Sequence, residues 1–189
     1  MHPSAHNTPE SLYAALRQEA EEQSLPPVHL WHPEHSGSID IRIMMDGRWL
    51  HEGVEIKRMG LVKVLASVLR RDTDGFVLVT PAERLLIEVE DAPFIAGGLE
   101  VQNAGTPDQE LLFTTNLGEM VVASAQRPIE VTYTNPQDPA EPRPYVEVRS
   151  GLKALIARSV FYRLVELTHE QNGRYVVTSA GSDFDLGAV

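Results

Sequence analysis

Two arginines are the side chains that this sequence places best for binding an anion. Arg58 and Arg158 each stand at the predicted start of a helix, where a positive side chain opposes the helix dipole, so helix stability does not explain them. A guanidinium beside the free N–H groups of a helix start can hold a phosphate or a carboxylate. The pattern predicts an anion-binding site. An ion pair with a carboxylate such as Asp40 or Glu83 is the structural alternative.

Six further residues complete the candidate ligand-binding set. Arg42 and Arg149 lie on the alternating strands predicted before the two helices, and only one of each flanking set can face a ligand because successive strand residues point to opposite faces. The other four are two aromatic residues, which more often serve packing, and two residues of a strand-end turn: Trp31, Tyr162, Thr115 and Asn116. The turn residues belong to the set because binding groups often lie on loops.

Three histidines at intervals of three residues suggest a metal site only weakly. His29, His32 and His35 could supply imidazole ligands, but Pro33 disfavours a helix that would bring them together. Their spacing matches no zinc signature, so no metal is predicted, and whether the three side chains converge stays open.

An Asp…Glu-x-Lys arrangement of the kind found in metal-dependent nucleases occurs at Asp46, Glu55 and Lys57. The dipeptide Asp46-Gly47 is better explained as a hairpin turn. No phosphate-binding glycine loop, dinucleotide fingerprint or nucleophile elbow is present, so no cofactor is predicted. The sequence leans away from an enzyme, with a metal-dependent phosphoester hydrolase as the alternative.

Composition narrows the function classes further. The chain has no cysteine, which excludes thiol nucleophiles, disulfides and iron–sulfur clusters. Its 16 Lys and Arg stand against 27 Asp and Glu, and a net charge of −11 disfavours nucleic acid as a partner. No apolar run is long enough to cross a bilayer and no signal peptide is present, so a cytoplasmic protein without a membrane partner is expected.

Positive charge is nevertheless concentrated in two segments. Residues 42–84 hold 8 basic and 6 acidic residues, residues 143–174 hold 6 and 3, and residues 85–142 hold 1 and 10. If the two basic segments face each other, the cleft between them could attract a small anion within an acidic protein. Paired, solvated charges are the alternative.

These segments also read as an internal repeat. Ile56-Lys57-Arg58 and the helix predicted over 61–71 are repeated about 100 positions later by Ile156-Ala157-Arg158 and the helix predicted over 156–169. Alternating strands precede the two helices at 39–43 and 145–149, and strands follow at 75–80 and 173–178. Each unit is therefore predicted as strand, turn, short strand, helix and strand, which is an α+β fold.

The segment between the repeats is predicted as an antiparallel meander with strands at 99–102, 110–115, 120–124 and 129–134. Four prolines between Pro136 and Pro144 predict a stiff extended connector after it. The expected organisation is an N-terminal helix and linker (1–27), a first α+β unit (28–94) and a second, mostly antiparallel unit with its helix towards the C-terminus (95–189). The tail from Gly181 to Val189 shows no clear period.

Several distinctive runs carry a family resemblance between about Pro27 and Gly173. In these runs the chain resembles the bacterial family catalogued as domain of unknown function 1285: Trp31-x-Pro33, Gly37-x-Ile39-Asp40-Ile41-Arg42-Ile43-x-x-Asp46-Gly47-x-Trp49, Leu69-Arg70-Arg71, Leu78-Val79-Thr80-Pro81, Val89-Glu90-Asp91-Ala92-Pro93-Phe94, Thr115-Asn116-Leu117-Gly118, Pro144-Tyr145-Val146 and Gly151-Leu152-x-Ala154-Leu155-Ile156-x-Arg158-x-Val160-Phe161-Tyr162-x-Leu164-Val165. The resemblance implies two related α+β units, the second superficially similar to a pleckstrin-homology fold, and a small, nucleotide-like ligand in the cleft between them. It also implies a role in bacterial signal transduction, with a signalling protein as a further partner, and no established enzymatic activity.

Together these observations predict a cytoplasmic ligand-binding or sensor protein whose ligand is small and anionic. A protein-interaction module is a further alternative, which would need an exposed apolar patch.

Overall fold

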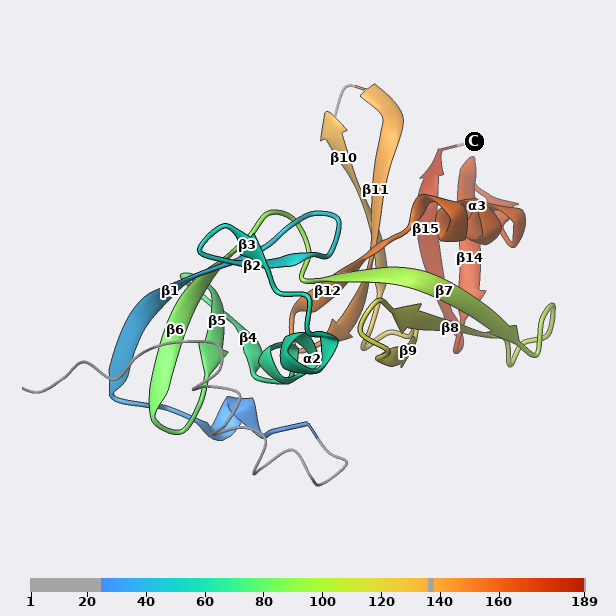
Figure 1. The fold of residues 1–189 in the computed structure, drawn as a ribbon. Coiled ribbons are helices and arrows are strands. Elements are labelled where there is room, and N and C mark those ends of the chain that lie inside the picture. The colour runs from blue at the N-terminus through green and yellow to red at the C-terminus, as the bar shows by residue number, and fades with distance from the viewer. Residues whose placement is uncertain (1–24, 136–137, 189) are drawn as a thin grey trace, which may run out of the picture. The chain divides into compact units, whose positions relative to one another are not determined.

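The chain folds into two compact units, of which the first ends at Asp91 and the second begins at Ala92. The computed structural model describes residues 25–135 and 138–188 (Figure 1). The helix predicted near the N-terminus falls in residues 1–24 and lies outside the described residues. Within these residues, each unit contains at least one β-sheet and one α-helix, so the expectation of two similar α+β units is confirmed at this level.

In its described residues, the first unit is a six-stranded sheet with one α-helix. The strands follow the order β3-β2-β1-β6-β5-β4, in which β1 and β6 are parallel and the other neighbours are antiparallel. The elements are η1 (Val28–Leu30), β1 (His35–Ile43), β2 (Trp49–His51), β3 (Val54–Glu55), α2 (Met59–Ser67), β4 (Leu69–Asp72), β5 (Gly75–Val79) and β6 (Glu83–Val89).

The predicted first strand and its hairpin are confirmed. Ile41 and Ile43 are buried in β1 while Arg42 between them is exposed, as period-2 alternation requires. In the turn that follows, the Arg48 N–H donates to Asp46 Oδ1 at 3.1 Å, so Asp46 serves the turn. The pKa of Asp46 is lowered chiefly by its side-chain hydrogen bond with Arg48.

The prediction that the helix of the first unit extends over 61–71 was wrong at its C-terminal end. Helix α2 ends at Ser67, and Leu69–Asp72 form strand β4, which pairs with β5 through Leu69↔Leu78. Leu69 is fully buried and satisfies a helical pattern and a strand pattern equally well, so local periodicity could not distinguish them. The choice is made by pairing with β5 across a tight turn.

In its described residues, the second unit has nine strands, arranged in two sheets, and the helix α3. A six-stranded sheet has the order β10-β11-β12-β7-β8-β9, with β7 and β12 parallel, and a three-stranded antiparallel sheet has the order β13-β14-β15. The elements are β7 (Phe94–Gln102), β8 (Glu110–Thr115), β9 (Met120–Val122), β10 (Ile129–Asn135), β11 (Asp138–Arg149), β12 (Leu152–Ile156), α3 (Arg158–Glu166), β13 (His169–Gln171), β14 (Arg174–Ser179) and β15 (Ser182–Ala188). Strand β15 lies in the tail for which the sequence offered no period.

The four strands of the predicted meander are present, but their pairing differs from the prediction. Strands β7, β8 and β9 form an antiparallel meander at one end of the sheet, whereas β10 pairs with β11 at the other end. Turn residues fix a hairpin between neighbouring strands but do not fix the pairing of strands separated by a longer link, which explains the difference.

The proline-rich segment is not a connector from Asp138 onward, contrary to the prediction. It forms the first half of β11, which pairs with β10 in register Tyr133↔Pro142 and Val131↔Pro144. The Glu147 N–H donates to the Pro128 carbonyl at 3.0 Å on the β10 side, so the alternating nitrogen atoms of Pro142 and Pro144 face away from β10. Proline is tolerated in a strand where its nitrogen lies on such an edge.

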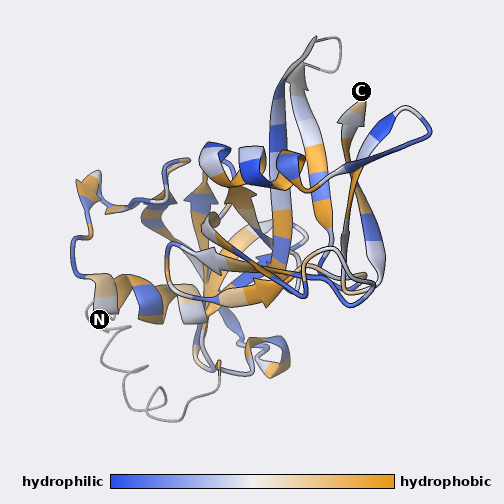
Figure 2. Ribbon diagram, turned by 90° about the vertical axis from the view of Figure 1, so that its right-hand side faces the viewer, coloured by the Kyte–Doolittle hydropathy of each residue, from blue (hydrophilic) through white to orange (hydrophobic). Residues whose placement is uncertain are grey.

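The predicted repeat is reflected in the order of elements. A hairpin, a helix and three consecutive antiparallel strands occur as β1-β2, α2 and β4-β5-β6 in the first unit, and as β11-β12, α3 and β13-β14-β15 in the second. The short strand β3, between β2 and α2, has no counterpart between β12 and α3. Helix α3 carries hydrophobic and hydrophilic residues along its length (Figure 2) and buries Val160, Phe161 and Leu164. No helix in the described part of the chain is both long and apolar enough to span a membrane.

Candidate ligand-binding groove

Two of the predicted site residues line one groove in the second unit. Arg158 is the first residue of α3 and Tyr162 follows one turn later, which places the two side chains on neighbouring positions of the same helix face. This groove, which we call the α3 groove, has a volume of about 480 Å³. Its lining residues are Glu141, Pro142, Arg143, Pro144, Leu155, Ile156, Ala157, Arg158, Phe161 and Tyr162.

The groove exists because two paired strands differ in length. Strand β12 lies beside β11 only from Tyr145 onward and ends at Ile156, where Ala157 leads into α3. The first half of β11 therefore continues past the end of β12. The edge that this leaves open at Pro142 and Pro144 forms a wall of the groove, together with the first turns of α3.

Basic side chains outnumber acidic ones in the groove. Arg143 and Arg158 line it together with a single acid, Glu141. Among the groups that the structure describes, Arg158 has no hydrogen-bond or ion-pair partner, and its side chain is exposed. Arg143 Nε donates to the Tyr145 hydroxyl at 3.1 Å, which fixes the direction of that guanidinium. An anion entering the groove would meet positive charge in a chain that is acidic overall.

The start of α3 adds to this preference for anions. The N-cap residue is Ala157, which makes no side-chain capping bond, and the first turn of the helix contains no acidic residue. The N–H groups of Val160 and Phe161 both bond to the Ala157 carbonyl, at 2.9 Å each, whereas no described backbone carbonyl accepts from those of Arg158 and Ser159. Unbonded N–H groups at a helix start favour negative charge.

Arg58 has a closely related position in the first unit. It is the N-cap residue of α2 and is exposed, whereas Arg158 is the first residue inside α3. The predicted correspondence of the two helix starts therefore holds to within one residue. Arg58 is not among the residues that line the α3 groove.

The two predicted strand arginines have carboxylate partners. Arg42 Nε donates to Glu88 Oε2 at 2.7 Å on the neighbouring strand β6. Arg149 donates to both oxygens of Glu119, at 3.0 and 3.1 Å, and its guanidinium lies 5.4 Å from the centre of the Phe94 ring. These contacts agree with the alternative that the basic residues of the chain form ion pairs with its own carboxylates. A ligand-binding role for either arginine stays a prediction.

Thr115, Asn116 and Trp31 also have structural contacts. The Glu119 N–H donates to Thr115 Oγ1 and the Ile95 N–H donates to Asn116 Oδ1, both at 3.0 Å, so the two side chains hold the turn after β8. Trp31 is half-buried after η1 and its main-chain carbonyl accepts a hydrogen bond from Arg70. Their roles in ligand binding, like the expectation of a site between the units, stay predictions.

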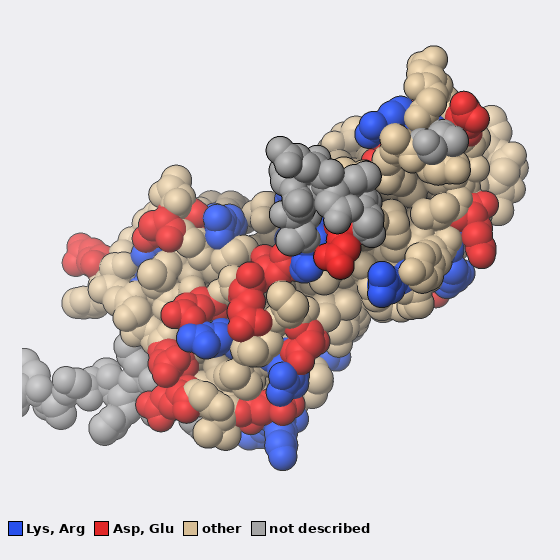
Figure 3. Space-filling view, turned by 90° about the horizontal axis from the view of Figure 1, so that it is seen from above, with Lys and Arg blue, Asp and Glu red and all other residues tan. Residues whose placement is uncertain are grey.

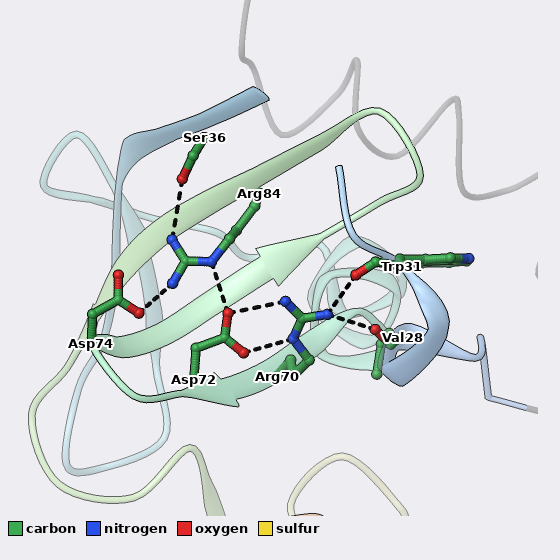
Figure 4. A network of polar contacts seen from close by, with 7 residues as sticks. All are labelled: Val28, Trp31, Ser36, Arg70, Asp72, Asp74 and Arg84. Carbon is green, nitrogen blue, oxygen red and sulfur yellow. Dashed lines mark hydrogen bonds and ion pairs between the residues drawn. The ribbon is translucent and has the colours of Figure 1, made fainter. Parts of the chain in front are cut away.

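Sequence reasoning missed a polar network in the first unit (Figure 4). Asp72 accepts from Arg70 Nε and Arg84 Nε, both at 2.7 Å, and Arg84 is also paired with Asp74. Arg70 further donates to the carbonyls of Val28 and Trp31, at 2.7 and 2.9 Å, and so attaches η1 to β4. An i, i+2 pair of opposite charges within one strand is the sequence signal for such a network, but β4 was predicted as the end of a helix.

The network lowers the pKa of Asp72. Hydrogen bonding to Arg70 is the main cause that lowers the pKa of Asp72 from 3.8 to about 2, with burial opposing it and Arg84 adding to it. The carboxylate therefore stays ionised to lower pH than an ordinary aspartate does, which suits its role between two guanidinium groups.

A second hollow, of about 680 Å³, lies over this network. Its lining residues are the four charged members of the network and four neighbours: Arg70, Asp72, Asp74, Arg84, His29, His32, Arg71 and Thr73. No group of three or more His, Asp or Glu residues in the described part of the chain is arranged to hold a metal ion. On the face shown in Figure 3, basic and acidic side chains lie beside each other rather than in a patch of one sign.

Comparisons with known proteins identify relatives of unknown function. Residues 26–92 match the family described as "Domain of unknown function (DUF1285), N-terminal domain", and residues 93–186 match "Protein of unknown function (DUF1285), C-terminal domain". A crystal structure of a DUF1285 family protein from Silicibacter pomeroyi DSS-3 is 44% identical in sequence, with a TM-score of 0.83 over 94% of this chain and 95% of that chain.

A more distant crystal structure shows likeness of fold alone. This DUF1285 family protein from Shewanella baltica OS155 is 23% identical, with a TM-score of 0.54 over 69% of this chain and 94% of that chain. No curated protein sequence matches the chain.

Proposed function

The chain belongs to the DUF1285 family, and we propose that it is a ligand-binding or sensor protein that holds a small anionic ligand in the α3 groove of its second unit. The observation that supports this most is Arg158, a cation at an uncapped helix start, exposed in a groove and without a described partner. Arg143 is the second cation of the same groove. The proposal involves no chemical reaction.

The binding mode follows from the groups in the groove. Arg158 supplies a planar set of N–H donors that matches a phosphate or a carboxylate, and the helix start supplies further donors. Arg143, oriented by the Tyr145 hydroxyl, approaches from the β11 wall. A nucleotide-like ligand fits this combination of positive charge and exposed aromatic surface.

Two broader expectations belong to the same proposal. The described part of the second unit combines a mixed six-stranded sheet, an antiparallel three-stranded sheet and one amphipathic helix. This combination supports its superficial likeness to a pleckstrin-homology fold. A cytoplasmic sensor that changes its ligand occupancy could act in bacterial signal transduction through a protein partner.

Thermal melting and calorimetric titration of the whole chain test the proposal. The probes are inorganic phosphate and nucleoside mono- and diphosphates, each with and without Mg²⁺. We expect at least one phosphate-bearing probe to raise the melting temperature without Mg²⁺, because a ligand that binds only the folded state stabilises it by mass action. Arg158→Ala should weaken that binding by about tenfold or more, the worth of a charge-assisted hydrogen bond.

Arg163→Ala is the matched control. Arg163 is an exposed arginine of the same helix that does not line the groove, so its removal changes the net charge equally and should leave affinity within about twofold. Equal losses for both variants would contradict the proposal. Stabilisation only with Mg²⁺, accompanied by turnover, would favour a phosphoester hydrolase, and the absence of any shift would favour an interaction module.

A further inference from the structure

We infer that the ligand of the α3 groove joins its anionic group to a flat apolar ring, which lies against Tyr162. This inference rests on the proposed anion site and specifies the other half of the ligand. Tyr162 is 58% exposed although it is a large aromatic residue, and it follows Arg158 by four positions on α3. Residues four apart on a helix are neighbours, so an anion held by Arg158 would carry its substituent towards the Tyr162 ring.

The lining around Tyr162 suits a ring better than a second polar group. Pro142, Pro144, Leu155 and Phe161 also line the groove, and none of these side chains carries a polar atom. Flat apolar groups stack on aromatic faces and remove apolar surface from water. A bare inorganic anion would leave this part of the groove unused.

The open edge of β11 argues against a peptide as the occupant. Strand addition needs N–H donors and carbonyl acceptors in alternation along the edge. Pro142 and Pro144 have no N–H, and their nitrogen atoms are those that face away from β10. The edge therefore lacks the donors at both positions, and recognition must come from side chains and from the start of α3.

The test compares two phosphate monoesters of equal charge, methyl phosphate and phenyl phosphate, by calorimetric titration of the whole chain. We expect phenyl phosphate to bind about tenfold more tightly, since burial and stacking of the ring favour it by about 1.4 kcal/mol. Tyr162→Ala should abolish this preference while methyl phosphate affinity stays within about twofold, because the anion contacts remain. Tyr162→Phe should retain the preference.

Tyr175→Ala is the control, because Tyr175 is also partly exposed but does not line the groove. It should change neither affinity. Equal affinities for the two esters in the unaltered protein, or a preference that survives Tyr162→Ala, would overturn the inference while leaving the anion site intact. Failure of both esters to bind would overturn the anion site and this inference together.

Discussion

The side-chain amide of Gln109 donates to the main-chain carbonyl of Thr178 at 2.8 Å, although 69 positions separate the two residues. Ser179 reinforces this contact from the next position. Its hydroxyl is fully buried, accepts from the Leu111 N–H at 2.9 Å and donates to the Ala123 carbonyl at 2.7 Å. These bonds attach the β14–β15 hairpin to the β8–β9 region within the second unit.

Replacing Ser179 by Ala should therefore destabilise the protein by about 1–3 kcal/mol, because it leaves a buried N–H and a buried carbonyl without a partner. Urea unfolding measures the change. The exposed Ser159→Ala is the control and should alter the free energy of unfolding by less than about 0.5 kcal/mol. A loss as small as that of the control would mean that water replaces the hydroxyl.

Asp72→Asn should remove an acid-dependent part of the stability. The folded pKa of about 2 lies below the ordinary 3.8, so the stabilisation is complete above about pH 4 and is lost as the pH falls towards 2. The difference is worth about 2 kcal/mol at neutral pH. Unfolding by urea at pH 7, 4 and 2.5 should show a smaller fall in stability for the variant than for the unaltered chain. The exposed Asp108→Asn should follow the unaltered chain.

Trp49→Phe should be tolerated. Trp49 is fully buried, and its indole nitrogen is, among the described residues, the buried side-chain polar atom without a hydrogen-bond partner. Losing that unsatisfied N–H offsets the smaller volume of Phe, so we expect a change of less than about 1 kcal/mol. Trp49→Ala should instead cost about 3–5 kcal/mol. A loss of stability for Trp49→Phe as large as that for Trp49→Ala would contradict this prediction, because it would mean that the indole N–H makes a stabilising hydrogen bond in solution.

Gly187→Ala should be destabilising by about 1–3 kcal/mol. The residue has a φ of 133°, and an added Cβ would lie 2.9 Å from the Tyr133 hydroxyl oxygen. Adding Tyr133→Phe should recover the part of the loss that comes from this contact, which a double-mutant cycle in urea measures. Strict additivity of Gly187→Ala and Tyr133→Phe in this cycle would contradict the contact between the two residues.

Gly60→Ala is the opposite case of a glycine replacement. Its added Cβ would meet nothing within 4 Å in α2, so the change should stabilise the protein by about 0.5–1 kcal/mol.

The amino-acid sequence determined the local elements and the family of this protein. The strand containing Ile41 and Ile43, the turn at Asp46 and the helix that buries Phe161 all follow from patterns within a few residues. The resemblance to the DUF1285 family is confirmed over residues 26–186 for the same reason, since it rests on linear runs of residues. Arg158 and Tyr162 were recognisable as candidates from type and spacing alone.

Tertiary structure decided which strands pair and which charges meet. A proline-rich run can be a connector or an edge strand, and only the presence of β10 beside it makes residues 138–149 a strand. Asp72 and Arg84 lie 12 positions apart, and they meet because β4, β5 and β6 fold back on one another. Local sequence determines the periodicity of each element, whereas the energy of strand pairing depends on partners far along the chain. The groove beside α3 could not be predicted for this reason, because it forms where β11 extends beyond the end of β12.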